Sequence, residues 1–255
     1  LGVLDSVLVL SGLDPCGGAG ISADIESINQ FSVTPLPIVT TLTVQNTQSV
    51  KSTQTVDTQL ITEQFNHLKE DVDFSVVKIG LLSSKSQIQT ITSLLKTCEA
   101  LTIVLDPIVS SSTNQQLLDE QALKSLKQEL LPMVTVLTPN VAELNALSST
   151  DDEQQAIESL PCEWVLLTTT DTSKNEIEHR LYHHAQCIER FTYTKLPGDY
   201  HGSGCTLSSA ISALLALGID VNIACKRALD YTYQSLLNAK SIGKMQYHPN
   251  RQAPK

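Results

Sequence analysis

Short apolar runs alternate along this chain with longer stretches in which apolar residues recur every three or four positions. A short apolar run fits a buried strand, whereas the longer recurrence fits an amphipathic helix. The predicted strands are 7–10, 37–42, 74–79, 101–105, 134–137 and 164–167, with a weaker hairpin over 177–194. The predicted helices are 21–31, 58–68, 84–95, 118–131, 141–147, 204–217 and 221–237. Strands separated by helices indicate an α/β fold with one mostly parallel sheet and helices on both faces.

Polar residues follow several of the predicted strands. They are Asp14, Gln45, Asp106, Asn140 and the stretch 168–171. Ligands of open α/β sheets bind outside the carboxyl ends of the strands. We therefore expect these residues to converge on one rim of the sheet, and the functional site to lie there.

The composition of the chain indicates a single domain. The 255 residues are 41% hydrophobic and show no low-complexity linker, which fits a single domain over 1–255. Flexibility is expected only in the C-terminal tail, about 240–255. Six scattered cysteines without a CxxC pair indicate reduced thiols and a cytoplasmic protein, and no clustering of Cys with His suggests zinc.

Charge and hydropathy argue against two classes of partner. The formal net charge is −10, with 27 acidic residues against 17 Lys and Arg, so nucleic-acid binding is not expected. No apolar run approaches 18 residues, so no membrane span is expected. The apolar segment 1–12 lacks a positive leader and a cleavage site, and it is interpreted as a strand.

A glycine-rich turn follows the first strand, reading Asp-Pro-Cys-Gly-Gly-Ala-Gly over 14–20. Glycines let the backbone approach a ligand closely, and the helix that follows offers free N–H groups. No Gly-Lys-Ser/Thr follows, so this is not a Walker loop. A plain strand-to-helix turn explains the motif about equally well.

A second motif, His-Gly-Ser-Gly-Cys-Thr over 201–206, opens a long helix. The candidate catalytic residues are Gly202, Ser203, Gly204 and Cys205. Their N–H groups and the helix dipole would form an anion hole for a phosphoryl group in transfer. The same position is expected to lower the pKa of Cys205 and make it a candidate base. A glycine-rich cap with a buried cysteine is the simpler interpretation, and His201 alone is more typical of a packing or hydrogen-bonding residue than of a catalyst.

A third motif places Asp106 at one strand end, and Asn140 and Glu143 at the next. Residues three apart share a face of a helical turn, and hard oxygen ligands suit Mg²⁺ carried on nucleotide phosphates. The alternative is a capping box, with Asn140 as N-cap and Glu143 as its partner. Judged alone, capping is the better interpretation.

The order of these motifs resembles the hydroxymethylpyrimidine/phosphomethylpyrimidine kinase family of the ribokinase-like superfamily, from Ser11 to about Leu237. The matching blocks are 11–24, 41–47, 77–82, 105–107, 130–132, 137–140 with Glu143, and 201–209. The Gln-Asn-Thr block at 45–47 and the block at 201–206 separate this family from sugar kinases, which carry Asp where Cys205 stands.

The resemblance implies a ribokinase-like three-layer α/β/α sandwich with a central mostly parallel sheet, and a homodimer. It implies ATP-dependent phosphorylation of 4-amino-5-hydroxymethyl-2-methylpyrimidine and of its monophosphate in thiamine biosynthesis. Gln45 matches the residue that binds the aminopyrimidine edge. The substrate-binding residues implied are Asp14, Ala19, Gln45, Leu81 and Val109. ATP would lie near Asn140, Thr168 and Thr170, with Mg²⁺ at Asp106, Asn140 and Glu143.

Two departures from the family pattern lie near the expected nucleotide site. One is the loop 112–116, where Ser-Thr-Asn-Gln-Gln replaces a Ser-Gly-Asp-like loop. The family usually has Lys-Gly-Gly-His where this chain has Thr-Thr-Thr-Asp over 168–171. A phosphate-contacting lysine is therefore missing, and Lys78 and Lys195 are the first candidates to replace its charge. Two alternative functions remain open: a pyridoxal or pyridoxine kinase, and a catalytically weak or silent pyrimidine-binding homologue.

Overall fold

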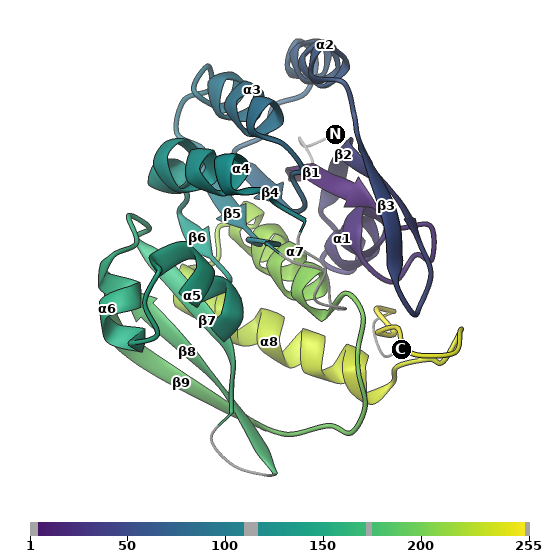
Figure 1. Cartoon of the computed structure of the whole chain (residues 1–255), viewed down its shortest axis with the longest axis vertical. Helices are drawn as coiled ribbons and strands as arrows, with labels where there is room; N and C mark the ends of the chain where they lie inside the picture. The colour runs from purple at the N-terminus through teal and green to yellow at the C-terminus, as the bar shows by residue number, and fades with distance from the viewer. Residues whose placement is uncertain (1–4, 110–116, 172–174, 253–255) are drawn as a thin grey trace.

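The computed structural model describes residues 5–109, 117–171 and 175–252 (Figure 1). Within them the strands form one sheet in the order β3-β2-β1-β4-β5-β6-β7-β8-β9. The strands are β1 (Ser6–Leu13), β2 (Thr34–Gln45), β3 (Val50–Thr55), β4 (Val76–Ile79), β5 (Thr102–Leu105), β6 (Val136–Leu137), β7 (Trp164–Asp171), β8 (Glu176–His183) and β9 (Gln186–Thr194). Neighbouring strands from β2 to β7 in this order pair in parallel, while β3, β8 and β9 join antiparallel.

Helices cover both faces of the sheet. One face carries α1 (Gly20–Asn29), α7 (Ser203–Ala216) and α8 (Val221–Leu237). The other carries α2 (Thr58–Lys69), α3 (Lys85–Leu95), α4 (Glu120–Ser125), η1 (Leu126–Leu130), η2 (Leu131–Met133), α5 (Val141–Ser148) and α6 (Glu153–Glu158). The expected three-layer α/β/α sandwich of the ribokinase-like class is confirmed. Among the described residues, no helix is both long and apolar enough to cross a membrane.

Strand β1 shows why the fold needs two helical layers. Leu8 and Leu10 pack with α2 and α3, whereas Val7 and Val9 pack with α1 on the opposite face. Side chains alternate between the faces of a sheet, so a continuous apolar run requires cover on both sides.

The short helix α6 was not predicted, and two further details of the helices and strands differ from the sequence-based expectation. The edge strand β3 was not predicted, because its side chains are mostly exposed and polar and carry no apolar alternation. The helix expected over 118–131 changes its winding after Ser125 and ends as a 3-10 turn at Met133. Pro132 cannot donate a backbone hydrogen bond, which explains why regular α-helix does not continue through it.

The tail after α8 contacts the body of the protein through residues that include the buried His248 and Arg251, and its expected flexibility stays a prediction. Lys240 and His248 form an antiparallel bridge within the tail. Arg251 is only 3% exposed. Its Nε donates to Thr206 Oγ1 at 2.8 Å and its Nη2 donates to the Gly18 carbonyl. The tail thereby ties together the two glycine-rich motifs.

Candidate active site

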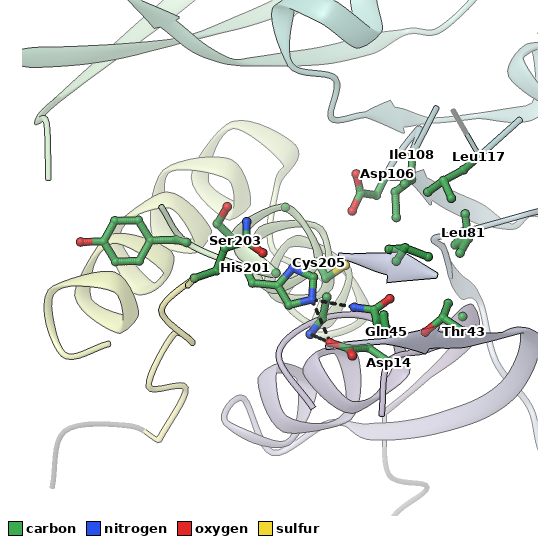
Figure 2. A pocket seen from close by; sticks show the side chains of 18 of the residues that line it. Asp14, Thr43, Gln45, Leu81, Asp106, Ile108, Leu117, His201, Ser203 and Cys205 are labelled. Atoms are coloured by element: carbon green, nitrogen blue, oxygen red, sulfur yellow. Dashed lines mark hydrogen bonds and ion pairs between the residues drawn. The ribbon is translucent and has the colours of Figure 1, made fainter. Parts of the chain in front are cut away.

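A cavity of about 430 Å³ lies at the carboxyl ends of the parallel strands (Figure 2). The predicted site residues that line it are Asp14, Ala19, Gln45, Leu81, Asp106, Asn140, Glu143, Thr168, Gly202, Ser203, Gly204 and Cys205. They come from the ends of β1, β2, β4, β5, β6 and β7 and from the start of α7. The expected convergence on one rim of the sheet is therefore confirmed.

Two predicted residues do not line the cavity. Ile108 lines it in place of Val109, in a tight turn where the Ile108 N–H donates to the Asp106 carbonyl at 2.9 Å. Thr169 lines it in place of Thr170, whose buried hydroxyl donates to the Glu178 carbonyl on β8. A bulge between Leu167 and Thr170, with Thr169 at φ 61°, shifts the alternation at this point.

Asp14 organises the first glycine-rich turn. Its carboxylate accepts hydrogen bonds from the backbone N–H groups of Cys16, Gly18 and Ala19, at 2.8, 3.1 and 3.0 Å. His201 Nε2 lies 2.8 Å from its Oδ2. Burial alone would raise the pKa of Asp14, but the bonds from His201 and from the turn hold it below the ordinary value. Asp14 is therefore an anionic anchor that joins the two motifs.

The same contact orients Gln45. The amide nitrogen of Gln45 is placed 3.1 Å from His201 Nε2, which is also the atom nearest Asp14. With Asp14 ionised, His201 Nε2 must donate to it and cannot also accept from Gln45. The Gln45 amide therefore turns its oxygen toward His201, because the hydrogen-bond network decides which way an amide faces. The Gln45 NH₂ group then faces the cavity.

The start of α7 requires glycine on steric grounds. Gly202 is the N-cap with φ 84°, and a Cβ there would collide with the Gly18 carbonyl. A Cβ on Gly204 would lie 3.4 Å from Asp106 Oδ2. No side chain caps this helix, so its first N–H groups are left to the cavity that Ser203 and Gly204 line. This is the geometry of an anion-binding helix start.

The expected lowering of the Cys205 pKa is wrong. Burial raises the pKa of this thiol to about 12, and the charges of Asp106 and Asp24 add to the rise. Lys78 and a backbone bond from Gly20 act in the opposite direction but do not outweigh burial. The thiol interacts with Asp106 and moderates the rise in the pKa of that carboxyl group. The helix-start argument failed because it took no account of the desolvation of a 6% exposed side chain.

Asp106, which is buried, and Glu143, which is half-buried, form an acidic pair. Burial raises the pKa of Asp106 to about 6 and that of Glu143 to about 8, and the charge of Asp106 adds to the rise at Glu143. The capping box is present as well, with Asn140 Oδ1 accepting from Glu143 N–H and Glu143 Oε2 accepting from Asn140 N–H, each at 2.9 Å. Two neighbouring carboxyl groups whose charges repel suit a divalent cation, and oxygen donors suit Mg²⁺.

Lys78 cannot replace the missing lysine, contrary to the expectation from sequence. It is fully buried, and its Nζ lies 2.7 Å from Asp24 Oδ1. Burial would lower the pKa of Lys78, but Asp24 holds it above the ordinary value, so the charge is kept and already paired.

A second cavity of about 320 Å³ adjoins the first. The residues that line both cavities are Thr168, Thr169, Tyr200, Ser203 and Gly204. Lys195, the other candidate cation, lines the second cavity together with His179 and Tyr193. The start of α7 therefore separates two adjacent binding volumes.

Several lining residues were not expected from sequence. They are Thr43, Asn46, Leu117, Tyr200 and Gln246. Gln246 belongs to the packed tail, beyond the last apolar pattern that the sequence offered. His201 was expected to be a packing or hydrogen-bonding residue, and its contacts with Asp14 and Gln45 confirm this.

Replacement of Arg251 by methionine is expected to lower the free energy of unfolding by about 1–3 kcal/mol, the usual cost of leaving buried acceptors unsatisfied. The acceptors are the Gly18 carbonyl and Thr206 Oγ1. Urea unfolding followed by circular dichroism measures this. Lys226→Met, which breaks an exposed pair with Asp230, is the control and should change stability by less than about 1 kcal/mol. Equal losses in both variants would show that the tail is not an anchor.

The sheet order, the helical layers and the paired cavities define a ribokinase-like small-molecule kinase. The sequence profile of the phosphomethylpyrimidine kinase family matches residues 14–250. The chain belongs to this family.

Two relatives show how far the similarity extends. A hydroxymethylpyrimidine/phosphomethylpyrimidine kinase from Aquifex aeolicus is 32% identical over 246 residues, which cover 93% of this chain and 96% of the relative. One from Streptomyces coelicolor is 30% identical over 252 residues, covering 93% and 90%.

Solved structures share the fold. A phosphomethylpyrimidine kinase from Clostridium difficile superposes with a TM-score of 0.77 at 28% identity, covering 91% of this chain and 99% of that one. A Staphylococcus aureus pyridoxal kinase in complex with AMP-PCP gives 0.88 at 20% identity, covering 98% and 94%. At that identity the second similarity concerns the fold alone.

Proposed function

We propose that this chain transfers the terminal phosphoryl group of ATP to the hydroxymethyl group of 4-amino-5-hydroxymethyl-2-methylpyrimidine, and then to the resulting monophosphate, in thiamine biosynthesis. The observation that carries the proposal is the meeting of Gln45, Cys205 and the glycine-rich helix start in one cavity. ATP consumption in the presence of the pyrimidine tests it.

The two cavities suggest where each substrate lies. The pyrimidine occupies the cavity lined by Ala19, Gln45 and Leu81, and the nucleoside of ATP occupies the second cavity. The phosphates pass between them, beside Thr168 and the Ser203–Gly204 backbone. The Gln45 amide can donate a hydrogen bond to a ring nitrogen and accept one from the ring's amino group with the second lone pair of its oxygen. This pattern matches the aminopyrimidine edge.

Phosphoryl transfer depends mainly on positioning and charge stabilisation. The N–H groups of residues 202–205 would bind the oxygens of the phosphoryl group as negative charge develops on them. Asp106, Asn140 and Glu143 would hold Mg²⁺ through its waters, and the ion would neutralise charge on the ATP phosphates.

Cys205 holds the position of the base. At neutral pH a thiol with a pKa of about 12 is protonated, so it cannot act alone. The proton of the acceptor hydroxyl can pass to the Cys205 sulfur while the thiol's own proton passes to Asp106, with which the thiol interacts. The acceptor oxygen forms its bond to the terminal phosphorus of ATP while the bond between that phosphorus and the bridging oxygen breaks. ADP leaves with the bridging oxygen, and one proton ends on the Asp106 carboxylate.

Introducing the missing lysine is expected to strengthen nucleotide binding. In Thr168→Lys a charged donor replaces a neutral hydroxyl at the wall between the cavities, and a charge-assisted bond is roughly twice as strong as a neutral one. ATP should bind about fivefold more tightly, from about 1 kcal/mol of added binding energy, and depend less on Mg²⁺. Calorimetric titrations at several Mg²⁺ concentrations measure both effects.

The control for this variant is Thr53→Lys, which adds the same charge on the exposed face of β3. If both lysines tighten ATP equally, net charge explains the gain. If the unmodified chain binds ATP tightly without Mg²⁺, a cation such as Lys195 already replaces the missing lysine, and the prediction is wrong.

The proposal includes a homodimer in the cytoplasm. Its support is an apolar strip on an edge of the molecule, formed by Leu42 and Val44 of β2 and by Ile242 and Met245 of the tail, which are 42% to 57% exposed. The two parts are linked by a hydrogen bond from Lys244 N–H to Thr47 Oγ1. Sedimentation velocity tests the association, because a dimer would have the mass of two chains.

A further inference from the structure

Three potential metal ligands meet at the edge of the sheet opposite the cavity. They are Glu163, just before β7, and His183 and His184, at the turn between β8 and β9. Trp164 pairs with His183 in the sheet, which brings the two segments together. The sequence shows no clustering of Cys with His, so it did not predict this group. One of the three ligands is a glutamate that belongs to another strand.

The ligand atoms are close enough for one ion. A carboxylate oxygen of Glu163 and one ring nitrogen from each histidine all lie within 4.8 Å of one another, and His183 Nε2 is 3.2 Å from Glu163 Oε1. Tetrahedral bonds of about 2.1 Å place ligand atoms about 3.4 Å apart. Rotation of the exposed Glu163 and His184 side chains can supply the remaining approach.

The surrounding contacts hold this group in place. The ring of His183 stacks on Trp164, with centroids 3.9 Å apart and an interplanar angle of 20°. The N–H of His184 donates to the Glu163 carbonyl at 2.9 Å. His184 and Ala185 have φ values of 48° and 61°, a turn that favours Asn-Gly.

We propose that Glu163, His183 and His184 bind a divalent transition-metal cation of the Zn²⁺ class, with water at the remaining positions. Two imidazoles and one carboxylate suit Zn²⁺, Ni²⁺ and Cu²⁺ and do not suit Mg²⁺, which prefers oxygen ligands. The site is separate from the proposed kinase chemistry. Bound metal would join the β8–β9 turn to the start of β7 and stabilise the folded chain by mass action.

Fluorescence offers a direct test, because Trp164 is the single tryptophan of the chain and stacks on a proposed ligand. Titration of the full chain with Ni²⁺ should quench Trp164 saturably, and Zn²⁺ should compete for the same site. Mg²⁺ should have no effect. Exposed Cys187 lies on the neighbouring strand, so all titrations use a Cys187→Ser background.

Two variants test the ligands. His184→Asn suits the left-handed turn but removes the imidazole, and Glu163→Gln keeps the shape of the side chain. Each should weaken Ni²⁺ binding at least about tenfold, or 1.4 kcal/mol. His67→Ala, at an exposed histidine that contacts Glu70 on α2, should change nothing. Absence of saturable quenching below about 1 mM, or equal affinity in the two ligand variants and the parent, would overturn the proposal.

Discussion

Replacement of Cys205 by alanine is expected to lower turnover by roughly 10²-fold or more, the range usual for loss of a general acid–base group. Among the described residues, Cys205 is the one cysteine that lines the cavity, and its thiol interacts with Asp106. In the variant the acceptor hydroxyl then has no group to pass its proton to Asp106. Steady-state kinetics at saturating ATP measure the loss, and calorimetry should show nearly unchanged pyrimidine binding.

The matched control is Cys225→Ala, a buried thiol on α8 that packs among apolar side chains. It shares the chemical change and the loss of packing but does not line the cavity. Its turnover per folded molecule should stay near that of the parent. Near-normal turnover in Cys205→Ala would show that the backbone of the α7 start carries catalysis without the thiol.

Replacement of Gln45 by leucine is expected to weaken pyrimidine binding by about 1–3 kcal/mol, or about fivefold to 150-fold. Leucine has a similar size but leaves the polar edge of the ring unpaired in the cavity. The change also removes the contact with His201 at 3.1 Å. Calorimetric titration with the pyrimidine measures the loss, while ATP affinity should hardly change.

Gln59→Leu, on the exposed side of α2, is the control for the loss of an amide. It should leave both ligands unaffected. If Gln45→Leu weakens ATP and the pyrimidine equally, Gln45 supports the structure of the rim and does not recognise the ring.

Much of the fold was accessible from the sequence, because apolar periodicity reports burial. The run at 7–10 predicted a strand covered on both faces, and β1 is such a strand. Strand β3 was not accessible, because an exposed edge strand needs no apolar alternation. Its place depends on pairing with β2, which is a tertiary contact.

The site was predictable in position but not in detail. Strand ends located Asp14, Gln45 and Asp106 correctly, because parallel strands bring their carboxyl ends to one rim. Ile108 lines the cavity where Val109 was expected. Which of two neighbouring side chains in a loop faces a cavity depends on the local backbone, which sequence spacing does not specify. The raised pKa of Cys205 depends on burial, which only the assembled layers produce.

The contacts of the tail also could not be predicted from the sequence. Arg251 anchors the two glycine-rich motifs through a side chain that lies 233 residues from Gly18 along the chain. Periodicity describes neighbours along a helix or strand, and it carries no information about contacts of this separation.

The central claim is phosphoryl transfer to the pyrimidine, and one coupled ATP-consumption assay with two acceptors tests it most directly. The chain is assayed with ATP and Mg²⁺, once with 4-amino-5-hydroxymethyl-2-methylpyrimidine and once with pyridoxal. We expect ATP consumption with the pyrimidine, continuing to a second equivalent as the monophosphate is phosphorylated, and a lower kcat/KM with pyridoxal. Preference for pyridoxal would assign the chain to the alternative activity. Binding of the pyrimidine without ATP consumption on either acceptor would contradict the kinase account.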